Sequence, residues 1–188
     1  SVDTKIVNQS TGESVGWAEM LSRIPGRSIV GRASSKQMGL PQYTTFAAQI
    51  AEVEVDFETG QIHLRKFISA HDVGTILNPI GHQGQINGGA MMGIGYGLME
   101  ELKREGGHIE TLSFADYKIP NITDIPEMRT VILESEGIGV GPYNIKAIGE
   151  TPNAPTAPAI ANAVADAVGV RIRSLPVTAE KVFEALQA

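Results

Sequence analysis

The sequence has 188 residues, of which 42% are hydrophobic and 19% charged, a balance typical of a folded protein rather than a disordered chain. Its 15 basic and 21 acidic residues give a formal charge of −6, and no basic stripe is present, so we expect no nucleic-acid-binding surface. The absence of cysteine excludes disulfides, thiolate zinc sites and iron–sulfur clusters held by this chain.

The amino-terminal part of the chain is predicted to hold short strands around one helix. A strand is expected over 3–7, followed by a helix over 15–24 whose apolar residues recur at spacings of 3, 4 and 7. Ser14 is the expected N-cap of that helix, and Pro25-Gly26 ends it. A further short strand is expected over 28–33.

A β-hairpin is predicted over 46–73. Ile50, Val53 and Val55 are interleaved with acidic residues over 52–56 at close to a period of two, the pattern of a strand. Glu58-Thr59-Gly60 supplies the turn, in which Gly60 suits a positive φ angle.

A glycine-rich segment over 84–102 contains six glycines and fits a helical face only loosely. Each glycine costs a helix roughly 1 kcal/mol relative to alanine, so we expect another backbone or a ligand to approach this segment very closely. The run Gly93-x-Gly95-x-Gly97 also permits a nucleotide-binding loop, although it lacks the third glycine spacing and a following lysine. Close helix packing is the other interpretation of these later glycines.

The remaining elements predict an α+β fold. They are an edge segment near 109–115, a strand over 128–134, an Ala-rich helix over 155–168 stopped by Gly169, a short strand over 170–173 and a helix over 179–186 capped by Thr178. Apolar runs break well before the roughly 20 residues of a membrane span, and the first residues lack a secretory signal pattern, so we expect a cytoplasmic location and no membrane contact.

Three positions are candidates for chemistry. The Gln85 amide, beside the bare backbone of Gly84, can hold a polar heterocycle or a phosphate-bearing ligand, or it is a solvated glutamine at a helix start. His71-Asp72 permits a metal pair, but adjacent residues on a strand point to opposite faces, which favours separate hydrogen bonds and no metal site. Glu150, between Gly149 and a Thr-Pro step, is either a catalytic base buried beside a reactive centre or a glutamate interacting with a helix dipole.

Taken together, several segments resemble the molybdenum hydroxylase family of xanthine dehydrogenase and aldehyde oxidase. The matching segments are FETG at 57–60, HDVGTILNP at 71–79, GQINGGAMMGIGYGLMEEL at 84–102, DYKIP at 116–120, KAIGE at 146–150, and the Ala-rich helix with the LPVTAEKV that follows it. They follow the order and spacing of the family and cover roughly residues 14–188.

The resemblance implies an α+β molybdopterin cofactor-binding domain. Molybdenum is then held by the pterin dithiolene, so no metal ligand is expected from the protein. Glu150 takes the role of the general base that deprotonates a Mo–OH group, while Gln85 and Gly84 contact the cofactor. The implied reaction is oxidation of a small molecule, an N-heterocycle such as a purine or an aldehyde, with oxygen derived from water. Iron–sulfur clusters and FAD are expected on partner subunits.

The sequence departs from the family pattern in two ways. Thr151 replaces the proline that commonly follows the motif glutamate, which alters the loop. The chain is also much shorter than a molybdenum subunit, so residues 1–188 are interpreted as a single carboxyl-terminal molybdopterin-binding domain, either a split subunit or an excised domain, which needs the rest of that subunit and is inactive alone. The alternative function is that of a non-catalytic structural or assembly subunit.

Overall fold

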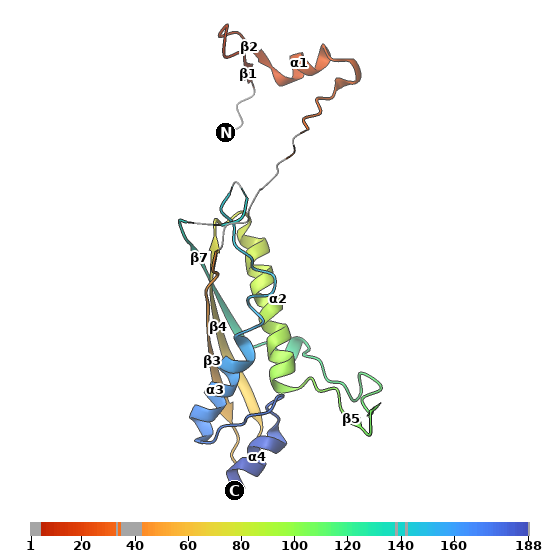
Figure 1. Cartoon of the computed structure of the whole chain (residues 1–188), viewed down its shortest axis with the longest axis vertical. Helices are drawn as coiled ribbons and strands as arrows, with labels where there is room; N and C mark the ends of the chain where they lie inside the picture. The colour runs from red at the N-terminus through yellow and green to blue at the C-terminus, as the bar shows by residue number, and fades with distance from the viewer. Residues whose placement is uncertain (1–4, 33, 35–42, 138, 142, 188) are drawn as a thin grey trace. The chain divides into compact units, whose positions relative to one another are not determined.

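The computed structural model describes residues 5–32, 34, 43–137, 139–141 and 143–187 (Figure 1). The chain divides into two compact units, Ser1–Met38 and Gly39–Ala188. None of the helices within the described ranges combines the length and the apolar character that a membrane span needs.

In the first unit, β1 (Lys5–Val7) pairs antiparallel with β2 (Ser14–Gly16), and α1 (Trp17–Ser22) and the short 3-10 helix η1 (Pro25–Arg27) follow. The predicted helix over 15–24 is therefore too long, and the prediction that Ser14 is its N-cap is wrong. Pairing with β1 holds Ser14 in an extended strand, and the N-cap is Gly16, which has no side chain to accept a hydrogen bond.

The strand predicted over 28–33 is also wrong for residues 28–32, which form no strand; residue 33 lies outside the described residues. A strand needs a partner for its backbone groups. In this unit β1 and β2 pair with each other, and among the described residues they form a sheet of two strands. Ile29 and Val30 favour β structure, but no partner strand lies beside them among the described residues.

The second unit is built on a mixed sheet in the order β3-β4-β7. β3 (Ala47–Val55) and β4 (Ile62–Gly74) form the predicted antiparallel hairpin, and β7 (Glu127–Glu134) runs parallel to β4. Gly60 has the predicted positive φ, 73°. The turn also passes so close to α4 that a Cβ atom there would lie 2.2 Å from the carbonyl oxygen of Ala179.

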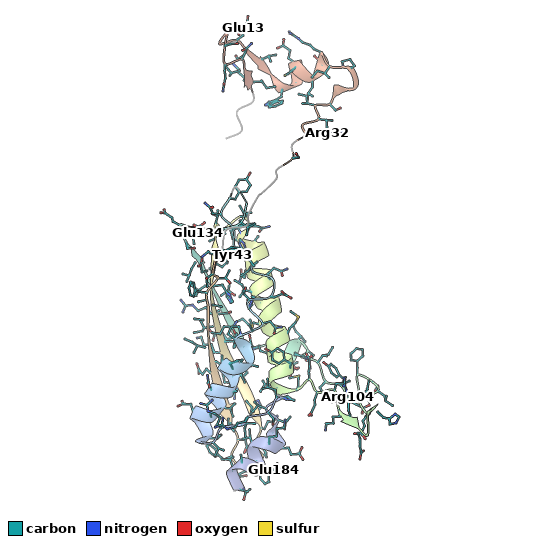
Figure 2. All side chains as sticks on the ribbon, viewed as in Figure 1. Glu13, Arg32, Tyr43, Arg104, Glu134 and Glu184 are labelled. Atoms are coloured by element: carbon teal, nitrogen blue, oxygen red, sulfur yellow. The ribbon has the colours of Figure 1, made fainter. Side chains whose placement is uncertain are left out.

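Two helices pack against one face of this sheet. They are α2 (Pro79–Leu98) and α3 (Thr156–Val168), and α4 (Ala179–Gln187) closes the far end. The core joins Phe67 of β4 to Ala90 and Ile94 of α2 and to Ile160 and Val164 of α3, all at most 1% exposed. Glu134 at the end of β7 and Glu184 in α4 mark opposite ends of this unit (Figure 2). Helices packed on one face of a mixed sheet confirm the α+β class.

The glycine-rich segment forms one continuous helix, α2, which Asn78 caps by accepting a 2.9 Å hydrogen bond from the Gly81 N–H. The run from Gly93 to Gly97 therefore lies inside a helix, where backbone N–H groups are bonded to carbonyls one turn earlier. A phosphate-binding loop needs free N–H groups at a helix start. The nucleotide-loop interpretation is wrong, and the helix-packing interpretation is confirmed by the contacts between α2 and α3 given below.

The carboxyl-terminal elements follow the prediction with one exception. Gly169 ends α3 in the left-handed conformation, with φ 74°, and Thr178 caps α4 by accepting a 3.3 Å hydrogen bond from the Lys181 N–H. The strand predicted over 170–173 is wrong, because these residues form an irregular connection with no strand partner among the described residues.

An arm leaves the core between α2 and β7. It contains the small hairpin of β5 (Arg104–Glu105) and β6 (His108–Ile109) and the 3-10 helix η2 (Ile122–Asp124). The edge segment predicted near 109–115 meets this hairpin only at Ile109, and residues 110–115 form no strand. At its base, the hydroxyl of Tyr117 donates a 2.8 Å hydrogen bond to the Glu100 carboxylate, and this bond, followed by burial, raises the pKa of Tyr117.

Candidate functional site

Gln85 and Glu150 lie on neighbouring parts of one surface. Gln85 projects from the second turn of α2 and is exposed. Its Oε1 atom lies 3.9 Å from the position that a Cβ atom would occupy on Gly149, the residue before Glu150. Glu150 is exposed as well. Two candidate residues that are 65 positions apart in the sequence are thus brought together by the packing of α2 beside the 146–150 segment.

Five of the seven glycines of α2 fall into two groups. Gly89, Gly93 and Gly97 are buried against the segment that leads into α3, where added Cβ atoms would lie 2.9 Å from Pro152 Cβ, 2.4 Å from Thr156 Cβ and 3.3 Å from Ala157 Cβ. Gly84 and Gly88 are exposed, and an added Cβ atom would meet nothing within 4 Å. Packing within the described residues explains why the first group are glycines, but it does not explain the glycines of the second group.

Glu150 begins a tight turn before α3. Its carbonyl oxygen accepts a 3.1 Å hydrogen bond from the Asn153 N–H, and α3 starts only at Thr156, with Pro155 as its N-cap. Glu150 therefore lies outside the first turn of α3, where a helix dipole acts most strongly. The helix-dipole interpretation is not supported. The described residues also leave the carboxylate in solvent, so the burial expected of a base would have to come from atoms outside them.

An ion pair fixes the chain just before Glu150. Lys146 pairs with Asp72 of β4, and the two side chains are 10% and 13% exposed. The Lys146 N–H donates a 2.9 Å hydrogen bond to the carbonyl of Val73, and Ser135 Oγ donates a 2.7 Å hydrogen bond to Asp72. Burial raises the pKa of Asp72, but the hydrogen bonds from Lys146, Ser135 and the Gly74 N–H and the charge of Lys146 outweigh it, and the pKa is lowered from 3.8.

Side-chain hydrogen bonds fix the chain just after Glu150. The carbonyl oxygen of Pro152 accepts hydrogen bonds from Gln49 Nε2 at 2.8 Å and from Thr156 Oγ1 at 2.9 Å. Tyr96 on α2 donates a 3.0 Å hydrogen bond to the carbonyl of Asn153. Both flanks of Glu150 are therefore bonded to the sheet or to α2, while its side chain projects from the turn between them.

His71 and Asp72 belong to separate networks on opposite faces of β4, as the hydrogen-bonding interpretation predicted. His71 is 1% exposed, and its Nε2 lies 2.7 Å from Ser69 Oγ. Its Nδ1 has no hydrogen-bond partner within the described residues. Burial lowers the pKa of His71, so the ring is neutral at pH 7. No group of three or more His, Asp or Glu side chains suited to a metal ion occurs in the described ranges.

Replacement of Asp72 by asparagine should lower the free energy of unfolding by about 1–3 kcal/mol at pH 7, because Lys146 loses a nearly buried charged partner. The pKa of Asp72 is lower in the folded than in the unfolded state, so its stabilisation is present above the unfolded-state value and is lost as the pH falls through the folded-state value. Urea unfolding followed from pH 7 downwards should therefore show the difference between the two proteins shrinking once the pH falls below the ordinary Asp pKa of 3.8. A difference that is constant with pH would contradict the ion-pair role.

Sequence reasoning missed Gln49, Tyr96 and Thr156, which hold the turn after Glu150. Gln49 and Pro152 are separated by 103 positions, so no local pattern could connect them. The available signals were a threonine at the start of the Ala-rich helix and a glutamine among the apolar residues of a strand.

Comparison with known proteins gives the family. Residues 2–126 match the model of the molybdopterin cofactor-binding domain. The chain belongs to this family. The matched residues include Gly84 and Gln85 and end before Glu150. Among curated relatives, the chain is 40% identical over 142 residues to a probable xanthine dehydrogenase subunit from Bacillus subtilis, covering 76% of this chain and 19% of the relative.

Further similarities agree with this family of molybdopterin-dependent oxidoreductases. The chain is 35% identical over 187 residues to the aldehyde oxidoreductase molybdenum-binding subunit of Escherichia coli, covering 98% of this chain and 25% of the relative. It superposes on the crystal structure of the aldehyde oxidoreductase of Desulfovibrio gigas with a TM-score of 0.69 and 34% identity, covering 77% of this chain and 16% of that one. The chain thus spans a quarter or less of the length of these relatives.

The exposed residues of α2 fit a molybdopterin group. Gln85 offers two N–H donors and one carbonyl acceptor to solvent, which suits a pterin ring or a phosphate. Gly84 and Gly88 leave bare backbone beside it.

Proposed function

We propose that this chain is part of a molybdenum hydroxylase in which Gln85 and Gly84 contact molybdopterin and Glu150 is the general base. The observation that carries the proposal is the 3.9 Å separation between Gln85 Oε1 and the Cβ position of Gly149. It supports one binding surface on which a group held by Gln85 is within reach of the carboxylate that follows Gly149.

When bound, the cofactor supplies a high-valent metal that accepts two electrons and makes water at the site more acidic. A carboxylate of ordinary basicity then suffices to remove a proton, and the role of Glu150 is to accept that proton on a carboxylate oxygen. The anchors at Lys146 and Pro152 hold the backbone on either side of Glu150, so the carboxylate is presented from a fixed turn.

The open glycines of α2 support the same surface. A glycine inside a helix costs roughly 1 kcal/mol relative to alanine, and the described residues give Gly84 and Gly88 no contact that would repay it. Approach of a cofactor to the bare helix backbone explains both positions.

The relatives support a proposal for the substrate and partners. The names of the relatives include xanthine dehydrogenase, aldehyde oxidoreductase and a subunit of a 6-hydroxypseudooxynicotine dehydrogenase complex. We propose a purine-like N-heterocycle or an aldehyde as the small-molecule substrate. The remainder of a molybdenum subunit would complete the site, and iron–sulfur and FAD subunits would carry the electrons away.

The cofactor role of Gln85 is tested by its replacement with alanine in the complete enzyme, with Gln83→Ala as the matched control. Gln83 is also exposed on α2, two residues earlier. Loss of one or two polar contacts should weaken cofactor retention about 5- to 30-fold, a change of about 1–2 kcal/mol. Molybdenum and pterin are measured per protein after dialysis.

We expect a lower content in the Gln85 variant and an unchanged content in the control. Equal contents in both variants would remove Gln85 from the cofactor site. The non-catalytic assembly function predicts instead that neither Gln85 nor Glu150 affects molybdenum content or turnover.

A further inference from the structure

We infer that Gln49 is a positioning residue for Glu150, acting from β3 through the carbonyl of Pro152. The inference rests on the proposed function, because it assigns Gln49 to the placement of the proposed base. Gln49 lies on β3, and neither the sequence motifs nor the matched family pattern assign it a role.

The Gln49 amide joins three elements at one point. Its Nε2 group donates to Ser69 Oγ of β4 at 2.8 Å and to the carbonyl of Pro152 at 2.8 Å. Its Oε1 atom lies 2.8 Å from Thr156 Oγ1, at the start of α3, whose single O–H is shared between this atom and the Pro152 carbonyl. Both N–H donors and the carbonyl are therefore used, and only a side chain with donors and an acceptor on one flat group can make all three bonds.

The partners of Gln49 have few alternatives. Ser69 is 1% exposed and Thr156 is fully buried, so each depends on protein groups for hydrogen bonding. Ser69 in turn lies 2.7 Å from His71 Nε2. An apolar side chain at position 49 would leave the Pro152 carbonyl with one fewer donor and Ser69 without its amide partner.

The Pro152 carbonyl transmits this bonding to Glu150. Pro152 follows Glu150 by two residues, within the turn closed by the 3.1 Å bond from the Asn153 N–H to the Glu150 carbonyl. The Pro152 ring is buried against Gly89 of α2, the helix that also carries Gln85. The turn is thus held between Gln49 on the sheet side and α2 on the other, which fixes the distance between Glu150 and Gln85.

The experiment compares Gln49→Met with the control Gln61→Met in the complete enzyme. Methionine keeps the length of the side chain and removes its hydrogen bonds, and Gln61 is exposed in the β3–β4 turn. Hydrogen exchange of the peptide over 149–156 reports the turn, and the amide of Val177, bonded to the Gly97 carbonyl at 2.7 Å, reports overall stability. Turnover is measured with xanthine and with benzaldehyde.

We expect Gln49→Met to accelerate exchange over 149–156, to leave Val177 protected, and to lower kcat by about 10²-fold, as a misplaced catalytic group does, with little change in KM or molybdenum content. Gln61→Met should behave as the wild type. Unchanged exchange and kcat in Gln49→Met would overturn the inference. Faster exchange everywhere with an unchanged kcat would also overturn it, because it indicates a general structural role.

A second pair of variants keeps the test decisive if Gln49→Met does not fold. Thr156→Val keeps the shape of the side chain and removes the hydroxyl that bonds Gln49 and Pro152, whereas Thr156→Ser keeps the hydroxyl. The inference predicts a lower kcat in the valine variant and rescue in the serine variant; the reverse order would overturn it. If Glu150→Gln retains turnover, the proposed function fails, while exchange over 149–156 still decides whether Gln49 holds the turn.

Discussion

Replacement of Glu150 by glutamine in the complete enzyme should lower kcat by about 10²–10⁴-fold, the usual contribution of a general base. Glutamine has nearly the same shape as glutamate but cannot accept the proton. Because the two anchors of the turn involve Lys146 and the Pro152 carbonyl rather than the Glu150 side chain, the turn itself should be unchanged. The measurements are kcat, KM and molybdenum content.

Molybdenum content in this variant should equal that of the wild type, which separates loss of the base from loss of the cofactor. Glu180→Gln is a suitable control, since Glu180 is exposed in α4 at the other end of the unit. Near-normal turnover in Glu150→Gln would exclude Glu150 from the mechanism. Loss of molybdenum together with turnover would instead assign Glu150 to cofactor binding.

The second large effect concerns two glycines of α2, whose replacement by alanine should change the stability of the fold in opposite directions. An alanine Cβ atom at Gly93 would lie 2.4 Å from Thr156 Cβ, so Gly93→Ala forces α2 and α3 apart and should lower the free energy of unfolding by about 1–3 kcal/mol. At Gly88, the Cβ atom would meet nothing within 4 Å, and Gly88→Ala should raise the free energy of unfolding by up to about 1 kcal/mol through its better helix propensity.

In Gly88→Ala, cofactor retention should fall although the stability of the fold rises. If molybdopterin approaches the bare backbone there, a methyl group stabilises the helix and weakens cofactor binding. Urea unfolding and molybdenum content measured on the same variants test both parts. A Gly88→Ala protein with full molybdenum content would show that no ligand approaches this position closely, and an unaffected stability in Gly93→Ala would contradict the tight contact with Thr156.

Much of the fold could be predicted from local sequence patterns. The alternation through 50–56 and the turn at Gly60 predicted the hairpin, and Gly169 and Thr178 predicted a helix end and a helix start. The strands predicted over 28–32 and 170–173 do not form, and the two wrong predictions have the same cause. Local β propensity is satisfied only if a partner strand lies alongside, and pairing is decided by distant parts of the chain.

The candidate site was predictable in part. The resemblance to the molybdenum hydroxylases singled out Gln85 and Glu150, and the structure brings them to one surface; their roles remain predictions. The groups that hold Glu150 could not be predicted, because Gln49 reaches Pro152 across 103 positions. The two kinds of glycine in α2 were also indistinguishable in the sequence, since only the packed helix reveals that Gly93 contacts Thr156 and that Gly84 contacts nothing.

The sequence of the arm between α2 and β7 can change without moving Gln85 or Glu150. Its base is closed just after α2 by the Tyr117–Glu100 hydrogen bond, and the arm also carries exposed apolar residues such as Leu112 and Phe114, 82% and 77% exposed. Insertions or exchanges in the β5–β6 hairpin would therefore leave the spacing of Gln85 and Glu150 intact. The hairpin can therefore vary while the turn that carries Glu150 keeps its bonds to the sheet and to α2.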